Sequence, residues 1–337
     1  MRIVIALILW VIPVALVAQD WEDQRLFNAQ ETMLRLRIIS STDTSFFAPV
    51  IESFVAQYPD IGVEYLVIGT KDTNEIFRAN PEAFDLVISS AMDLQLKAAN
   101  DGLARPVSDV PHPPWAQWRH SLFAFTSEPA AIVINRAAFA GHAIPKTRQE
   151  LIEALRARPE IFHGRVGTYD VRASGLGYLL ATQDARASET YWRLMEVMGA
   201  LDVRLYCCSG RMIDDLADGT LAVAYNVLGS YANVRVEMKD SIDVILPSDF
   251  PTTMMRTAMV SSQAPHPEQA SQFLRHLIAL QSGTQAHRLP LPPLNATLND
   301  DERATIPLEP ALMTFLDTLK RRKFLAEWEA SVIQKHP

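Results

Sequence analysis

Apolar runs that end in small polar residues recur along the first half of the chain, and a helical pattern follows each run. Three of them have strand character: Leu34–Ile39, Asp60–Ile68 and Phe84–Ile88. The first is followed directly by Ser40, Ser41 and Thr42, and the third by Ser89 and Ser90. Strands that alternate with helices in this way predict a mostly parallel sheet with helices on both faces, so the expected fold class is α/β.

The segment after residue 200 predicts a compact strand–helix–strand unit. Val203–Cys207 and Leu221–Tyr225 are apolar runs, and Ser209 between them is placed to cap an amphipathic helix. We expect the loops Cys208–Gly210 and Asn226–Ser230 at the carboxyl ends of parallel strands, where open α/β sheets bind ligands. The first loop also supplies a helix N-terminus, which favours an anion. An ordinary crossover that binds nothing would show the same pattern.

The chain has 337 residues, which is enough for two domains. Its net charge of −8 argues against a nucleic-acid partner, because no broad basic surface is available to neutralise phosphates. The one basic cluster, Lys320–Lys323, is interpreted as a solvated helix face. The two cysteines, Cys207 and Cys208, are adjacent, and we expect reduced thiols because a disulfide between neighbours strains the peptide.

The N-terminus has the pattern of a secretory signal. Arg2 precedes the almost wholly apolar stretch Ile3–Val17, and Ala18 provides a small residue before a cleavage site. The alternative is an uncleaved anchor helix, but the stretch is shorter than the ~20 residues that span a bilayer. We therefore expect residues 1–18 to be a signal peptide that is removed, and the mature protein to reside in the periplasm.

The order of several motifs resembles that of a known family. FDLVISS at residues 84–90 is followed by a helix and a Gly-Leu step, and GRVGTYDVRASG covers residues 164–175. DLADGTLAVAYN covers residues 215–226, and HPEQASQFLRHLIALQSGTQ covers residues 266–285. With these motifs in this order, the chain resembles the extracellular solute-binding proteins of ABC transporters. The resembled cluster holds ferric-iron, thiamine, sugar-phosphate and phosphoglycerate binders.

The resemblance implies a type II periplasmic-binding-protein fold, with two doubly wound α/β lobes joined by two crossing strands and a ligand held between them. One lobe would comprise residues 34–125 and 256–337, and the other residues 126–255. The implied ligand-binding residues follow strands in both lobes and are Ser40, Ser41, Thr42, Ser89, Ser90, Arg172, Ser174, Gly175, Ser209 and Asn226. We expect no cofactor and no bound metal.

Ferric-iron members of the resembled cluster place two adjacent tyrosines just after the strand equivalent to Leu221–Asn226. Gly229 and Ser230 stand there in this chain, and Tyr225 and Tyr231 flank the loop without being adjacent. A hard Fe(III) ion needs anionic oxygen ligands, which paired tyrosinates supply. A ferric-iron binder is therefore an alternative that the sequence disfavours.

The pattern favours a small anionic molecule as the ligand. Serine-rich loops at helix N-termini supply neutral donors, and Arg172 is able to add a bidentate pair to a carboxylate or phosphate. A surface ion pair with Asp170 is the competing interpretation of Arg172. We do not expect an enzyme, because the sequence has no Gly-x-Ser-x-Gly motif, no metal-type histidine pair and no nucleotide-binding glycine loop.

Two functional classes follow from this interpretation. The protein delivers a small anionic organic or phosphorylated ligand to an inner-membrane ABC permease, or it presents that ligand to a membrane sensor kinase. In both cases we expect a monomer whose two lobes close on the ligand by a hinge motion.

Overall fold

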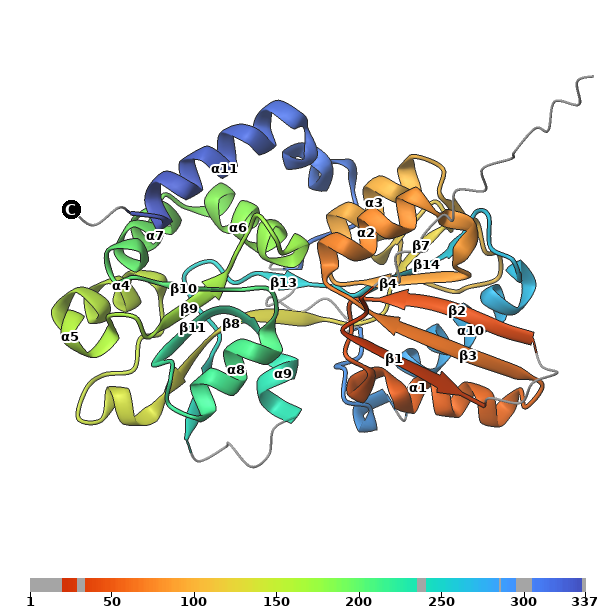
Figure 1. Ribbon diagram of the computed structural model, residues 1–337, viewed down its shortest axis with the longest axis horizontal. Helices are drawn as coiled ribbons and strands as arrows, with labels where there is room; N and C mark the ends of the chain where they lie inside the picture. Colours follow the sequence, from red (N-terminus) through yellow and green to blue (C-terminus); the bar gives the residue numbers. More distant parts are fainter. Residues whose placement is uncertain (1–19, 29–33, 235–240, 285, 295–304, 335–337) are drawn as a thin grey trace, which may run out of the picture.

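The computed structural model describes residues 20–28, 34–234, 241–284, 286–294 and 305–334, and it shows two α/β lobes side by side (Figure 1). The expected signal peptide, residues 1–18, lies outside the described residues. Within the described ranges, every helix is too short or too polar to cross a membrane. The mixed α/β class and the two-lobe architecture expected from the sequence are confirmed.

The first lobe is built on a sheet whose central strands are parallel. Strand β2 (Leu34–Ser40) lies between β3 (Ile61–Val67) and β4 (Leu86–Ser89) and runs parallel to both. Antiparallel strands complete the sheet: β1 (Asp23–Phe27), β5 (Ala104–Arg105), β6 (Gln117–Trp118), β7 (Leu122–Ala124) and β14 (Thr257–Ser261). Side chains on both faces of β2 are buried, which fits a strand covered by helices on two sides.

Four helices cover the first sheet. They are α1 (Thr44–Gln57), α2 (Thr70–Ala79), α3 (Met92–Asn100) and α10 (Pro267–Ser282). Helices α2 and α3 lie on one face, and α1 and α10 lie on the other (Figure 1). Helices α1, α2 and α3 each follow one of the three apolar runs identified in the sequence, so their N-termini gather at the carboxyl edge of the parallel strands.

The second lobe has a sheet in the order β10, β9, β11, β8, β12. Strands β9 (Val166–Tyr169), β10 (Arg204–Tyr206) and β11 (Val223–Leu228) are parallel, whereas β8 (Glu128–Asn135) and its neighbour β12 (Ile242–Ile245) are antiparallel to each other. The short β13 (Thr253–Met254) pairs with the start of β8. The helices of this lobe are α4 (Arg148–Ala157), α5 (Pro159–Phe162), α6 (Gly175–Ala187), α7 (Thr190–Ala200), α8 (Ser209–Ala217) and α9 (Gly229–Val234).

Short 3-10 helices connect several elements: η1 (Pro81–Ala83), η2 (Pro114–Ala116), η3 (Arg136–Phe139), η5 (Ala286–Arg288) and η7 (Pro310–Leu316). The expected unit after residue 200 is present as β10, α8 and β11, but β9 lies between its two strands. The prediction of a loop at Asn226–Ser230 is wrong. Strand β11 continues through Asn226, which adopts φ of 63° at a bulge, and α9 begins at Gly229.

The C-terminal helix α11 (Thr318–Val332) packs on the second lobe, against α7 (Figure 1). Its residues Phe324, Trp328 and Val332 recur every four positions, share one face and are buried in the hydrophobic core of that lobe. The expectation that residues 256–337 belong wholly to the first lobe therefore differs from the structure. The periodicity shows that a face is apolar, but it does not show which surface that face covers.

Two crossing strands join the lobes, as the sequence led us to expect, and they lie side by side. The Phe125 N–H donates to the Arg256 carbonyl over 2.9 Å, and β13 pairs with β8 beside this contact. A salt bridge is buried at the crossing. Arg256 donates from Nε and Nη2 to the two carboxylate oxygens of Glu128 over 2.8 and 3.0 Å, and both side chains are essentially unexposed.

Further hydrogen bonds satisfy this ion pair from both lobes. Arg256 Nη1 donates to Thr42 Oγ1 over 2.7 Å, and the hydroxyls of Thr126 and Ser230 donate to Glu128. Burial by itself would raise the pKa of Glu128, but the charge and hydrogen bonds of Arg256 bring that pKa below its ordinary value. The crossing is therefore held by a pair of charges that stabilise each other in the folded protein.

We expect Glu128→Gln to destabilise the protein by about 3–5 kcal/mol, because it leaves Arg256 buried without a counter-charge. Because the folded-state pKa of Glu128 is depressed, the stability that Glu128 contributes is fully present above pH ~4.3, the ordinary pKa of glutamate. This stability is lost as the pH falls through the folded-state pKa of Glu128. Urea denaturation at pH 7 and at pH 3 measures both effects.

The control is Glu268→Gln in the exposed pair with Arg105, which we expect to lower the stability by less than about 1 kcal/mol. Equal acid sensitivity of Glu128→Gln and the parent would contradict this account.

Trp328→Ala should destabilise the protein by about 3–5 kcal/mol, because Trp328 is 0% exposed between α11 and the second lobe. Leu319→Ala is the matched control on the same helix, since Leu319 is 64% exposed, and we expect almost no change from it. Thermal denaturation of the mature protein measures both variants. Similar losses for the two would show that α11 is not anchored through this face.

Candidate functional site

A small cavity lies between the two lobes, where helix N-termini from both of them meet. The first lobe contributes the N-terminal ends of α1, α2 and α3, and the second contributes those of α6 and α8. The space open to the centres of water molecules is about 40 Å³, which is room for roughly three or four waters. Its polar lining includes the side chains of Ser41, Thr70, Ser90, Tyr169, Ser174, Ser209 and Tyr231.

The lobes touch across this cavity. The Leu176 N–H at the start of α6 donates to Thr70 Oγ1 at the start of α2 over 3.1 Å. The Tyr231 hydroxyl of the second lobe donates to Asp43 of the first over 3.2 Å. A Cβ atom at Gly175 would lie 2.9 Å from Leu94 Cδ1, so a side chain at this position would force the leucine to shift. The two lobes are thus in their closed arrangement.

Serines of the first lobe form a hydrogen-bonded cluster at the cavity. Ser41 Oγ donates to Ser89 Oγ over 3.3 Å and accepts from the Ser90 N–H over 3.2 Å. Ser40 is fully buried beneath them, where its hydroxyl accepts from Tyr65 and from the Thr42 N–H. Ser41 and Ser90 therefore face the cavity, whereas Ser40, Thr42 and Ser89 support the loops that carry them.

Two carboxyl groups stand on the same wall as these serines. Asp43 is the N-cap residue of α1, and Glu22 precedes β1; both line the cavity. Burial, followed by the nearby charge of Asp43, raises the pKa of Glu22 above its ordinary value, and Arg211 opposes the shift. The guanidinium of Arg256 also reaches the cavity wall, but its charge is balanced by Glu128.

In the second lobe, Ser174 and Ser209 reach the cavity in different ways. Ser174 is the N-cap of α6, and its Oγ accepts from the Gly177 N–H over 3.1 Å. Ser209 was expected to cap α8, but Cys208 occupies the N-cap and Ser209 is the first helical residue. The hydroxyl of Ser209 instead bonds with Tyr169 on β9 and accepts from the Leu228 N–H on β11. It thereby ties α8 to the sheet.

Six of the expected ligand-binding residues do not line this cavity: Ser40, Thr42, Ser89, Gly175, Arg172 and Asn226. Arg172 pairs with Asp170, over 2.8 Å from Nε to Oδ1 and 2.7 Å from Nη2 to Oδ2, which is the competing interpretation given for it. Asn226 is buried inside the second lobe, where its Nδ2 donates to Asp184 over 2.8 Å. Asp184 also accepts from Tyr225, so the polar group of Asn226 belongs to an internal network.

Several residues that line the cavity were not among the expected ligand-binding residues: Glu22, Asp43, Thr70, Tyr169, Tyr231 and Arg256. The sequence contains a usable signal for Asp43 and Thr70, because each lies in the short polar segment between an apolar run and the start of a helix. The sequence contains no such signal for Glu22 or Arg256. Glu22 lies in a polar lead-in, and Arg256 reaches the cavity only because the crossing strands bring it there.

Arg172 lies at the edge of the cleft, in a second and larger hollow of about 330 Å³. Ser174 and Gly175 line this hollow too, so it adjoins the cavity. Five cationic side chains from both lobes surround it, Lys71, Arg78, Lys97, Arg172 and Arg321, with one acid, Glu75. The guanidinium of Arg321 lies 4.3 Å from the ring centre of Tyr178.

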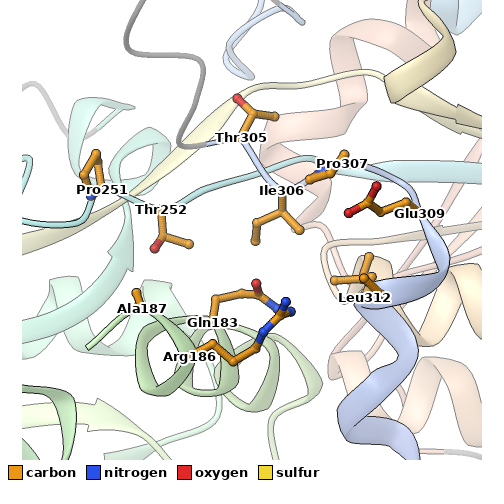
Figure 2. A pocket seen from close by; sticks show the side chains of 11 residues that line it. Gln183, Arg186, Ala187, Pro251, Thr252, Thr305, Ile306, Pro307, Glu309 and Leu312 are labelled. Atoms are coloured by element: carbon orange, nitrogen blue, oxygen red, sulfur yellow. The ribbon is translucent and has the colours of Figure 1, made fainter. Parts of the chain in front are cut away.

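A third hollow, with a volume of about 240 Å³, lies between α6 and the segments 251–252 and 305–312 (Figure 2). Gln183 and Arg186 of α6 form one side of it, and Thr252 and Ile306 lie across from them (Figure 2). None of the residues that the sequence singled out lines this hollow. The interlobe cavity, where both lobes supply hydroxyl groups and helix N-termini, is therefore the candidate site.

The residues that the structure describes contain no group of three or more His, Cys, Asp or Glu placed to bind a metal ion. The two tyrosines considered for iron lie apart. Tyr231 lines the cavity, whereas the hydroxyl of Tyr225 is held between Arg148 and Asp184 inside the second lobe. Burial raises the pKa of Tyr231 well above its ordinary value, so its phenol stays protonated at neutral pH.

Comparison with known proteins agrees with this architecture. The family model for bacterial extracellular solute-binding proteins matches residues 50–313. The crystal structure of a substrate-binding protein of an ABC transporter from Agrobacterium tumefaciens is 29% identical, with a TM-score of 0.85 over 92% of this chain and 98% of that one. No curated protein matches the chain.

More distant solved structures share the fold. The periplasmic binding protein AfuA from Actinobacillus pleuropneumoniae, with fructose-6-phosphate bound, is 13% identical, with a TM-score of 0.71 over 89% of this chain and 99% of that one. A periplasmic thiamin-binding protein is 16% identical, with a TM-score of 0.67 over 91% and 98%. Because the family model covers most of its length, this chain belongs to the bacterial extracellular solute-binding proteins.

Proposed function

We propose that the protein captures a small anionic solute, organic or phosphorylated, in the interlobe cavity and delivers it from the periplasm to an inner-membrane ABC permease. The observation that carries the proposal is the convergence of helix N-termini from both lobes on one hydroxyl-lined space. A helix N-terminus presents N–H groups and a partial positive charge, so it attracts an anion. An anion between the lobes interacts favourably with the helix N-termini of both lobes, and it therefore stabilises the closed arrangement.

The carboxyl groups of Asp43 and Glu22 narrow the chemistry of the solute. They repel a simple anion but accept hydrogen bonds from hydroxyl or ammonium groups. A solute that carries an acidic group at one end and hydroxyl groups at the other satisfies both sets of residues. Hydroxylated organic acids and sugar phosphates have this character. Because the closed cavity has room for only a few waters, such a solute enters while the lobes are apart.

The cationic hollow beside the cavity supports an anionic solute. Its cations outnumber its acids in a chain whose net charge is −8. Asp101 and Asp170 neutralise part of this charge, through ion pairs with Arg78, Lys97 and Arg172. Arg321 belongs to the basic cluster Lys320–Lys323. Among the residues that the structure describes, no carboxylate lies within ion-pair distance of its guanidinium. Positive potential at the mouth of a cleft raises the local concentration of anions.

The proposal is tested by thermal denaturation of the mature protein with inorganic phosphate, fructose 6-phosphate, citrate and thiamine as separate probes. A ligand of the native state at 100 times its Kd adds about 2.7 kcal/mol of stability, which is a measurable rise in Tm. We expect at least one hydroxylated anion to raise Tm and cationic thiamine to leave it unchanged. Stabilisation by thiamine alone would refute the anionic assignment.

Gly175→Val should abolish the rise in Tm caused by the anion while leaving the unliganded protein folded. A side chain at this position would meet Leu94, Ala91 and Thr70 of the opposite lobe and hold the lobes apart. Gly210→Ala is the matched control at the start of α8, because its nearest neighbouring atom would lie 3.8 Å away. We expect Gly210→Ala to bind normally. Full stabilisation of Gly175→Val by the anion would show that binding does not require this closure.

Arg321→Gln and Arg172→Gln should each slow association of the anion at low ionic strength, and the difference should vanish at high salt, because screening removes steering. Arg322→Gln is the control, since Arg322 is the exposed next residue on α11 and does not line the hollow. Stopped-flow measurement of tryptophan fluorescence gives the association rate. A change in dissociation alone would place these arginines in direct contact with the solute instead.

A further inference from the structure

The adjacent cysteines stand on the wall of the interlobe cavity. Both Cys207 and Cys208 line it, at the point where β10 ends and α8 begins. Cys207 is exposed and Cys208 partly exposed, so a small reagent is able to reach them. Their sulfur atoms lie 2.7 Å apart, and both are free thiols. This places two reactive groups of the same kind beside the solute site, which the solute-binding function does not use.

The surroundings of the two thiols favour ionisation of Cys207. The hydrogen bond between the two sulfur atoms, in which either atom can be the donor, lowers the pKa of Cys207 to about 7. The nearby charge of Arg211 acts in the same direction, whereas burial and Glu22 oppose it. A thiolate is the nucleophilic form of cysteine, so Cys207 is the better nucleophile at neutral pH. The sulfur of Cys208 lies within reach of any group that Cys207 acquires.

We propose that Cys207 and Cys208 form a thiol–disulfide exchange site whose substrate is a small disulfide such as oxidised glutathione. The Cys207 thiolate attacks one sulfur of that disulfide, whose S–S bond breaks and releases one thiolate with the bonding electron pair. Cys208 then gives its proton to solvent and attacks the Cys207 sulfur of the mixed disulfide. A bond forms between the two neighbouring sulfurs, and the second small thiolate leaves.

The exchange needs no oxidant or reductant other than the small disulfide and the two thiols. Two cysteine thiols lose two electrons and two protons in total, and the small disulfide gains the electrons and becomes two thiols. The ring that joins adjacent cysteines is strained, and strain makes a disulfide easier to reduce. The site is therefore reversible, with reduced thiols as the resting form expected from the sequence. Its chemistry does not depend on which solute the cavity binds.

The test treats the reduced mature protein with oxidised glutathione and follows its intact mass. We expect the parent to lose two hydrogen atoms without retaining glutathione, and dithiothreitol to restore the original mass. Cys208→Ser should stop at the intermediate and keep one glutathione on Cys207. Cys207→Ser should react roughly tenfold more slowly, because the thiol that remains is the less exposed of the two.

Three outcomes would overturn the proposal: no reaction of the parent protein, a parent that retains glutathione, or equal rates for the two serine variants. The parent measurements need no variant, so they decide the matter even if a substitution impairs folding. A second measurement compares the rate at pH 6 and pH 8. The rate should rise with pH across this range, because the thiolate fraction of Cys207 increases through its pKa.

Discussion

The buried ion pair between Arg256 and Glu128 is the interaction on which the two-lobe arrangement depends. The two residues are 128 positions apart in the chain, yet they meet where the crossing strands run side by side. A buried charge is tolerated only when it is paired and fully hydrogen-bonded, and this pair recruits Thr42 from one lobe and Ser230 from the other. The crossing, the floor of the cavity and the loop after β2 are therefore held by one charge-balanced network.

The same network explains why the cavity is not simply cationic. Arg256 reaches its wall with a charge already balanced by Glu128, and the carboxyl groups of Asp43 and Glu22 face the same space. In the proposed function, the attraction for an anion therefore comes from the helix N-termini, which act together when both lobes bring them close. Recognition and closure are thus the same event in physical terms. In the same proposal, the cationic hollow outside the cavity attracts the anion over a longer range, before the anion makes contact.

The candidate site was predictable where local sequence determines position, and unpredictable where a partner competes for the side chain. Ser41, Ser90 and Ser174 were found because a serine between a strand and a helix lies at the sheet edge whatever the rest of the chain does. Arg172 lies outside the cavity and pairs with Asp170, which is the alternative that the sequence left open. Asn226 was misplaced because the buried carboxylate of Asp184 takes its amide. The contact between Asn226 and Asp184 leaves no mark in a hydrophobic pattern, because the two residues are far apart in the chain.

The sequence by itself determined the α/β class, the central strands and the helices that follow them, because apolar periodicity and small polar residues act over a few residues. Only the tertiary structure decided that α11 covers the second lobe and that β9 lies between β10 and β11. It alone also decided that Arg256 and Glu22 border the cavity. Each of these depends on which of several similar surfaces come together. That choice rests on the packing and charge balance of segments far apart in the chain, and a periodic pattern does not encode it.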